Sequence, residues 1–140
     1  MAKFNANLNT LYVGASNPAA TKVTNKKMTG IDGPDNITDD VTTDDSAGPE
    51  ISTVYAGNMH ELKVEQLVDT ADSSYQFLDA RAKDGASFFT RWRPDGDGVG
   101  KTQADFSAIV TKRQPKREPP KKARDEFTIT ATNGTTWSTQ

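Results

Sequence analysis

Two consecutive stretches decide the fold that we expect: TGIDGPDNITDDVTTDDSAGPE (residues 29–50) and ISTVYAGNMHELKVEQLV (residues 51–68). The first contains seven acidic residues and no lysine or arginine. Its glycines, prolines and aspartates favour turns, so we predict a long acidic loop rather than a packed helix or a central strand. Loops of this length are uncommon in compact domains and usually have a function. The second stretch predicts two strands joined by a turn at 56–59, which together form a hairpin.

Period-two alternation identifies a half-buried strand in the second stretch, because successive side chains of a strand point to opposite faces. Leu62, Val64 and Val68 fall on one face, with Glu61, Lys63 and Glu65 on the other. Shorter strands are expected at 10–14 and, as an edge strand, at 20–24 and 27–29. Residues 73–83 predict the one helix. Its start resembles a capping box formed by Ser73 and Gln76, and Gly85 is a suitable stop.

The second half of the chain adds further strands. Residues 87–93 and 101–110 predict two strands around the turn 94–100, with Phe106, Ala108 and Val110 pointing inward. Residues 126–131 and 135–139 predict a hairpin through the pair Asn133-Gly134. We therefore expect a single mainly β domain over residues 1–140. It would be a β-sandwich or flattened barrel of about seven short strands, with one flanking helix and the long acidic loop.

Composition bounds the function. Only 34% of the 140 residues are hydrophobic and the mean hydropathy is −0.72, which is lean for one domain and suggests loops that are disordered or that order against partners. The chain has no cysteine, so disulfides and cysteine-based zinc sites are excluded. We expect no membrane insertion, since no apolar run approaches about 20 residues. The N-terminal residues do not resemble a signal peptide, so synthesis in the cytoplasm is expected.

The net charge of −2 conceals a segregation of charge. Opposite to the acidic loop stands a basic segment, residues 112–124, with seven basic residues and the single acid Glu118. Pro115, Pro119 and Pro120 should keep this segment out of regular strand pairing. It could neutralise nucleic-acid phosphates, but it has no aromatic side chain for base stacking, so we favour a solvated or interfacial loop.

No constellation of residues predicts catalysis, and we expect no enzyme and no cofactor. The lone histidine, His60, is best interpreted as a turn or interface residue. Asp95 and Asp97 match turn chemistry better than the spacing of a calcium loop. We predict no metal site, although a calcium site in the acidic loop is an open alternative. Trp92 and Trp137 are expected in the core or in an interface rather than as sugar platforms.

Three motifs carry a resemblance to a known family. They are Gly30-Ile-Asp-Gly-Pro34, the stretch from Asp40 to Glu50, and Pro94-Asp-Gly96 between two strands. Their order over residues 11–137 resembles the tail tube proteins of long-tailed bacteriophages and of related gene-transfer or tail-like particles. The resemblance implies a structural subunit of the virion tail that forms hexameric rings, stacked into a tube through which DNA passes without specific binding. It also implies contacts with other tail proteins, such as the tape measure and the terminator.

The resemblance turns the charge pattern into candidate sites. The two charged segments could pair within one subunit, but a tube favours pairing between subunits. The expected interface residues are Asp35, Asp39, Asp40, Asp44, Asp45, Lys116, Arg117, Lys121 and Lys122. Hairpins at 51–68 and 87–110 would join side by side between subunits. Strand alternation gives the expected lumen-facing residues, on an acidic or neutral lining that does not attract phosphates: Glu61, Glu65, Gln103, Asp105 and Ser107. The alternative is a monomeric β-sandwich module that binds calcium or carbohydrate.

Overall fold

The computed structural model describes residues 9–33, 35–40 and 51–140. It is mainly β with a single helix, as expected, and has ten strands in this part of the chain where about seven were predicted. In chain order the elements are β1 (Thr10–Gly14), β2 (Thr21–Lys22), β3 (Lys26–Asp32), β4 (Asp35–Asp40), β5 (Ile51–Ala56), β6 (Glu61–Leu67), α1 (Ser73–Asp84), β7 (Phe88–Arg93), β8 (Thr102–Lys116), β9 (Arg124–Ala131) and β10 (Thr136–Thr139).

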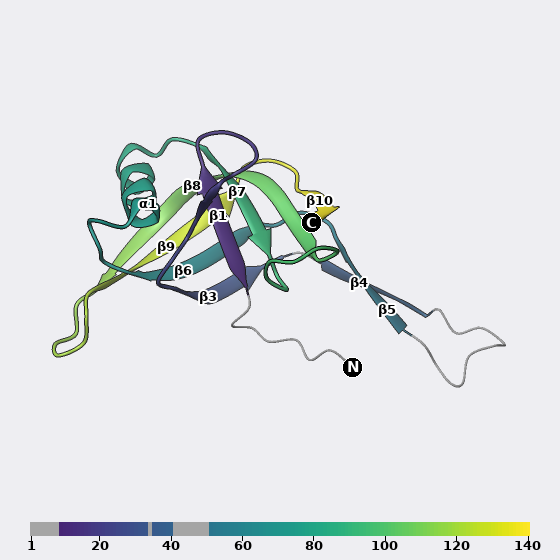
Figure 1. Cartoon of the computed structure of the whole chain (residues 1–140), viewed down its shortest axis with the longest axis horizontal. Coiled ribbons are helices and arrows are strands. Elements are labelled where there is room, and N and C mark those ends of the chain that lie inside the picture. The colour runs from purple at the N-terminus through teal and green to yellow at the C-terminus, as the bar shows by residue number, and fades with distance from the viewer. Residues whose placement is uncertain (1–8, 34, 41–50) are drawn as a thin grey trace.

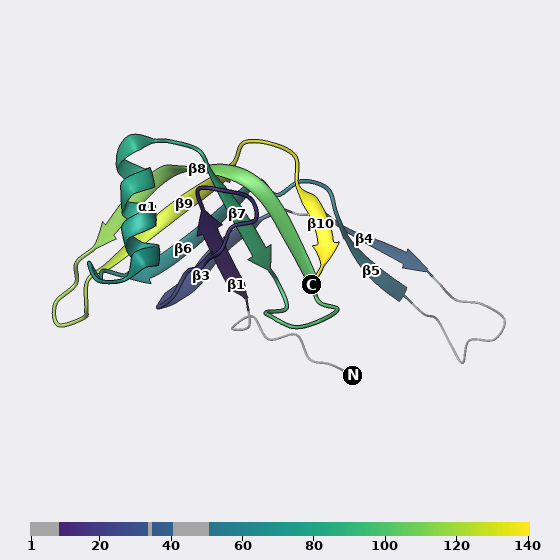
Figure 2. The ribbon, with the colours of Figure 1, turned by 45° about the horizontal axis from the view of Figure 1, so that its top comes forward.

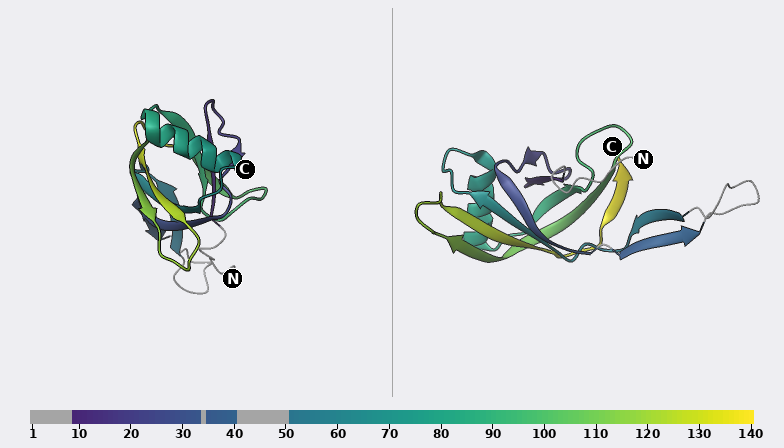
Figure 3. Two further views of the ribbon diagram at one scale, coloured as in Figure 1. Left: turned by 90° about the vertical axis from the view of Figure 1, so that its left-hand side faces the viewer. Right: turned by 90° about the horizontal axis from the view of Figure 1, so that it is seen from below.

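Eight of the strands form one antiparallel sheet in the order β2-β1-β7-β8-β9-β6-β3, with β10 paired to β8. The two ends of this path, β2 and β3, are consecutive in the chain and are separated only by residues 23–25. The sheet therefore curls back on itself into a flattened barrel, which is clearest when it is viewed from its end (Figure 3). Figure 1 shows α1 at one end of this barrel, close to β8 and β9.

The core is built from the inward side chains predicted by alternation. Leu62 and Val64 of β6 are fully buried, and Phe106, Ala108 and Val110 of β8 are at most 8% exposed. The other strands and the helix complete the cluster with residues such as Leu11, Phe127, Ile129, Tyr75 and Leu78. Burial of apolar side chains at roughly 25 cal/mol per Å² is the dominant stabilising term of such a barrel.

The start of the helix differs from the prediction by one residue. The N-cap is Asp72, whose carboxylate accepts hydrogen bonds from the backbone N–H of Ser74 at 2.9 Å and from its hydroxyl at 2.7 Å. Ser73 is therefore the first helical residue, and the proposed capping box with Gln76 is wrong. A carboxylate outcompetes a hydroxyl at this position because its charge also interacts favourably with the helix dipole. Gly85 ends the helix in the left-handed conformation, as expected.

Part of the stretch that was predicted to be a long acidic loop forms strands. β3 extends to Asp32, and residues 35–40 form β4, which pairs with β5 in a separate two-stranded sheet. The predicted hairpin of residues 51–68 is also wrong, although both of its strands exist. β5 pairs with β4, whereas β6 pairs with β3 and β9. We call β4 and β5 the acidic arm, which projects away from the barrel (Figures 1 and 2).

The basic segment also contributes to the sheet. β8 continues through Pro115 to Lys116, and Pro115 lies opposite Asp125 of β9. The expectation that prolines exclude this segment from strand pairing is therefore wrong for Pro115. A shift of register between Val110 and Lys112 marks an irregularity in the ladder. The β8–β9 turn, residues 117–123, which we call the tip, contains Pro119 and Pro120.

The predicted C-terminal hairpin is wrong as well, because β10 pairs with β8 and not with β9. β9 and β10 follow the same edge of β8 one after the other. The break between them is bridged by Thr132, whose N–H donates to the Ser107 carbonyl at 2.8 Å, and by Asn133, whose Oδ1 accepts from the Ser107 N–H at 2.8 Å. The Asn133 side chain thus replaces a backbone acceptor of the ladder, which explains an asparagine here without a hairpin turn.

This geometry predicts that Gly134→Ala is tolerated, with a change in unfolding free energy of no more than about 0.5 kcal/mol. A Cβ at Gly134 would meet its nearest neighbour, Asn58 Oδ1, at an ordinary 3.6 Å. In a tight Asn-Gly hairpin the glycine would need positive φ, and alanine would be strained. Asn133→Ala is the matched comparison and should cost about 1 kcal/mol through the lost hydrogen bond. Urea unfolding would contradict the assignment if Gly134→Ala were the more damaging of the two.

Candidate assembly surfaces

The acidic arm leaves the barrel at a well-defined base. Gly33 has a φ of 79°, and a Cβ there would lie 2.8 Å from the Asn58 carbonyl oxygen, so only glycine fits. The His60 N–H donates to the Asp32 carbonyl at 3.0 Å, and the His60 carbonyl accepts from the Ala131 N–H at 2.9 Å. His60 therefore belongs to the turn at the base of the arm, with an exposed side chain. The hydrogen bond between His60 and Asp32 keeps the chain segments that enter and leave the arm close together.

The structure brings three of the predicted acidic interface residues onto one strand of the arm. Asp35, Asp39 and Asp40 belong to β4, with Asp40 at the end far from the barrel. Asp44 and Asp45 lie outside the described residues. Within the described residues β4 and β5 pair only with each other, and an isolated two-stranded sheet is marginally stable in water. The arm is thus an element that would gain stability from a partner surface.

The tip lies at the opposite end of the longest axis of the molecule from the acidic arm (Figures 1 and 2). The described part of the arm and the basic tip therefore do not meet within one chain. The sequence left open whether the acidic and basic segments pair within one subunit or between subunits. For Asp35, Asp39 and Asp40, this geometry excludes pairing within one subunit.

Two of the predicted basic interface residues already have acidic partners within the fold, although their side chains are partly exposed, 37% for Lys116 and 48% for Arg117. Lys116 Nζ lies 3.0 Å from Glu65 and 3.4 Å from Glu126. Arg117 Nη1 lies 3.0 Å from the fully buried carboxylate of Asp125 and also donates to the Arg124 carbonyl at 2.6 Å. In the part of the chain that the structure describes, Lys121 by contrast pairs only with the exposed Glu118 at 3.7 Å. Exposed pairs of this kind contribute about 0–1 kcal/mol. Among the described residues, Lys121 and Lys122 are therefore the basic residues of the tip whose charge is not matched by a buried or partly buried carboxylate.

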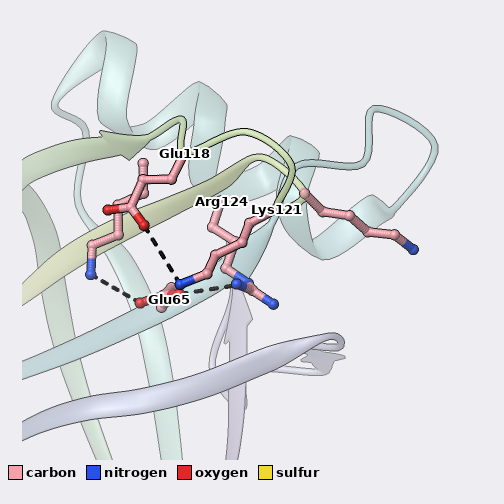
Figure 4. A pocket seen from close by; sticks show the side chains of 6 residues that line it. Glu65, Glu118, Lys121 and Arg124 are labelled. Carbon is pink, nitrogen blue, oxygen red and sulfur yellow. Dashed lines mark hydrogen bonds and ion pairs between the residues drawn. The ribbon is translucent and has the colours of Figure 1, made fainter.

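A hollow of about 210 Å³ lies beside the tip, between the turn and β6. Figure 4 shows Lys121 and Arg124 extending toward Glu65, with Glu118 on the neighbouring part of the turn. Arg124 Nε lies 3.6 Å from Glu65. The hollow is lined by four cations and two acids, namely Lys116, Lys121, Lys122 and Arg124 with Glu65 and Glu118. The hollow thus has an excess of positive charge.

Behind the tip, a buried charge network joins the helix to the hairpin. Asp125 Oδ2 accepts hydrogen bonds from the Tyr75 hydroxyl at 2.8 Å and from Arg113 Nη2 at 2.6 Å. Arg113 also donates to Asp79 of α1. Burial raises the pKa of Asp125, but the hydrogen bonds from Tyr75, Arg113 and Arg117 outweigh it and leave the pKa below the ordinary 3.8. The network thus links α1 to both β8 and β9.

A second cluster lies in the β7–β8 turn, where Asp95 and Asp97 occur as predicted for turn residues. Asp97 accepts from Tyr12 at 2.8 Å, from Arg93 at 2.6 Å and from Lys22 at 3.2 Å. Burial raises the pKa of Asp97, but these three donors lower it well below its usual range. A carboxylate already neutralised by two cations is a poor calcium ligand.

These two clusters predict acid sensitivity. The folded pKa values of Asp97 and Asp125 lie below the ordinary 3.8. The unfolded chain therefore binds protons first, so the stabilisation is complete above pH 3.8 and is lost as the pH falls through the folded pKa values. We expect the urea midpoint to decrease steadily below about pH 4. A midpoint that is constant from pH 5 to about pH 2 would contradict this assignment.

The predicted lumen-facing residues share one face of the barrel. Glu61, Glu65, Asp105 and Ser107 lie on the side of their strands opposite the core and are partly exposed. Gln103 is on the same side but only 7% exposed, because it is bonded to Arg93 at 3.1 Å and Ser138 at 3.1 Å. It has little surface to present to a lumen.

Each acid on this outer face has a cation beside it. Arg91 Nε lies 2.7 Å from Asp105, Lys63 lies 3.8 Å from Glu61, and Glu65 is paired with Lys116 as described above. These acids are therefore neutralised by their neighbours, and the face is not acidic. Phe89 also points to this side, because it alternates with the buried Phe88, and it lines a small hollow of about 140 Å³ with Asp105 and Asn133.

The sequence interpretation missed the Asp125 network and the Asp97 cluster. For Asp125 a signal was present: counting back from Phe127 and Ile129 in steps of two places a carboxylate on the inward face of β9. A buried carboxylate requires a cation or several donors. For Asp97 only Arg93, four residues earlier, is close in sequence. The other partners, Tyr12 and Lys22, come from β1 and β2 and leave no local signal.

No model of a known protein family matches the chain, and a search of curated proteins finds no match either. Among the described residues no group of three or more histidine, cysteine, aspartate or glutamate side chains could hold a metal ion. None of the helices in the described part of the chain is long and apolar enough to cross a bilayer. The described surfaces are complementary in charge, because the acidic arm lies at one end of the molecule and the cationic tip at the other.

Proposed function

We propose that this chain is the structural subunit of a tail-tube-like assembly, which self-assembles into stacked, hexameric rings whose lumen conducts DNA. Its action is assembly and not catalysis. The observation that carries the proposal is the polarity of the subunit: an unsupported acidic arm at one end and a cationic tip at the other. Surfaces that differ but complement each other join copies head to tail, and such contacts close into rings or extend into filaments.

The outer face supports the same function. A conduit for DNA must not retain phosphates, and retention requires a surplus of cations that releases counterions. Glu61 and Asp105 are each paired with one neighbouring cation, which leaves no such surplus around them. Glu65 differs, because it lines the cationic hollow beside the tip. We propose the part of this face around Glu61, Asp105 and Ser107 as the lumen lining, without Glu65, which belongs to the hollow beside the tip. The virion tail is the location that goes with this function, with tape measure and terminator proteins as partners at the ends of the tube.

A monomeric module that binds calcium or carbohydrate is the competing function, and observations on particular residues weigh against it. Asp97 is occupied by Arg93 and Lys22. Trp92 is 4% exposed within the core, and Trp137 packs against the core and donates its indole N–H to the Gly57 carbonyl at 2.9 Å. Neither indole ring is displayed as a flat platform for a sugar.

Negative-stain microscopy of the purified full-length protein tests the proposal. We expect rings or tubes with a central channel at low salt, and slower growth as salt rises, because the Debye length falls from about 10 Å at 0.1 M to about 3 Å at 1 M. Sedimentation should show the same loss of large species. A monomer at all salt and protein concentrations would overturn the proposal, and calcium-dependent stabilisation of that monomer would favour the binding module instead.

A further inference from the structure

The surface around the tip extends beyond the hollow described above. Two further hollows, of about 260 Å³ and 380 Å³, adjoin it. The first shares Glu65 and Arg124 with it, the second shares Lys122, and both contain Asn25 and Leu67. We call this continuous surface the tip groove. Its cations come from three elements and the turn, namely β3, β8, β9 and residues 117–123: Lys26, Lys27, Lys116, Lys121, Lys122 and Arg124.

The cations of the tip groove outnumber its acids, which are Glu65, Glu118 and Asp69. Lys116 and Arg124 share Glu65. Lys26 donates to the Asn9 carbonyl at 2.7 Å, and its pKa is lowered by burial and by Lys22. Within the described residues, Lys27 and Lys122 have no ion-pair partner. An anionic ligand of extended shape would therefore match the groove better than a single small ion.

We propose that the tip groove is the docking site for the acidic arm of a second copy of this chain. The chain supplies such a ligand itself, because residues 32–50 contain seven acids and no base. Asp39 and Asp40 are the last two residues of β4, at the far end of the arm, and the groove lies at the other end of the molecule. A single chain cannot satisfy both surfaces through these residues, whereas successive copies can. No aromatic residue lines the three hollows, so the groove lacks the stacking surface used by single-stranded nucleic acid.

This inference rests on the proposed function, and it also changes which residues form the interface. Lys116 and Arg117 act mainly within their own subunit, while Lys27 on β3, far from the tip in sequence, joins Lys121 and Lys122. Charged contacts of this kind set partner choice and association rate more than affinity. Repetition in every subunit of an assembly makes even weak contacts sufficient for register.

The absence of cysteine from the chain allows a direct test. Two full-length variants, Asp40→Cys and Lys122→Cys, are mixed and mildly oxidised. A disulfide forms only where the two Cα atoms come within about 7 Å. We expect the mixed dimer to form at least about tenfold faster than with the matched control Lys101→Cys, because docking raises the local concentration of the two thiols. Lys101 is also an exposed lysine, but it precedes β8 at the end of that strand away from the tip.

The outcomes separate this inference from the proposed function. Tubes without the selective cross-link would overturn the docking site and leave the tube function standing. The cross-link without tubes would support the docking site and count against the tube. Neither tubes nor cross-link would overturn both. Saturable binding of a single-stranded oligonucleotide that blocks the cross-link would assign the groove to nucleic acid and overturn the docking of the arm. Circular dichroism confirms that each variant is folded before mixing.

Discussion

Asp125→Ala is expected to lower the free energy of unfolding by about 3–5 kcal/mol, because it removes one partner of a buried ionic network and leaves the others in place. Tyr75 is 5% exposed and would lose its acceptor. Arg113 and Arg117 would lose the carboxylate that neutralises them. Since small domains are stable by only about 5–15 kcal/mol, this variant approaches the limit of folding. Urea unfolding followed by circular dichroism measures the loss.

Asp79→Ala is the matched control, since Asp79 interacts with the same guanidinium of Arg113. Its side chain is 24% exposed, against none for Asp125, and Arg113 keeps Asp125 when Asp79 is removed. The expected cost is about 1 kcal/mol or less. Asp125→Ala should also make the decline in stability below about pH 4 shallower without abolishing it, because one of the two carboxylates responsible is gone while Asp97 remains. Equal losses in the two variants, or an unchanged acid limb, would refute the network as the element that anchors the helix to the β8–β9 hairpin.

Most strands could be predicted from the sequence because alternation is a local property. Leu62 and Val64, or Phe106, Ala108 and Val110, show their buried face without any knowledge of their neighbours. The pairing of strands could not be predicted in this way. Asn133-Gly134 and residues 56–59 both resemble hairpin turns, yet the strands on either side pair elsewhere. Pairing depends on which edges remain open when the barrel closes, and the long β8 offers one edge to both β9 and β10.

For the candidate surfaces, too, local features could be predicted from the sequence and contacts between distant segments could not. The segregation of charge is visible in the sequence, and it led to Asp39, Asp40, Lys121 and Lys122. The difference between Arg117 and Lys122 is not visible there, although both are cations of one short segment. Arg117 lies beside a buried carboxylate on the facing strand, so its charge is already matched. Side-chain partners that come from distant segments decide which charges are left for a partner.

Removal of residues 34–56, which joins Gly33 directly to Gly57, is expected to leave a folded monomer and to abolish rings and tubes. The removed strands form their own two-stranded sheet, so the eight-stranded sheet keeps every one of its pairings. The hydrogen bond from the His60 N–H to the Asp32 carbonyl brings the two cut ends together, and a shorter loop costs less entropy to close. Circular dichroism and thermal unfolding should therefore resemble those of the complete chain, while sedimentation shows only monomer.

A second variant distinguishes the length of the arm from its charge. Asp35→Asn, Asp39→Asn and Asp40→Asn together keep β4 and remove three of its negative charges. If the tip groove attracts the arm electrostatically, this variant should assemble more slowly than the complete chain at low salt and be less sensitive to added salt, since three of the seven acids of residues 32–50 no longer carry a charge to be screened. Normal tubes from the chain without residues 34–56 would show that the arm is dispensable. Unchanged kinetics of the asparagine variant would instead show that the arm acts through its backbone, as a strand added to a neighbour's sheet edge.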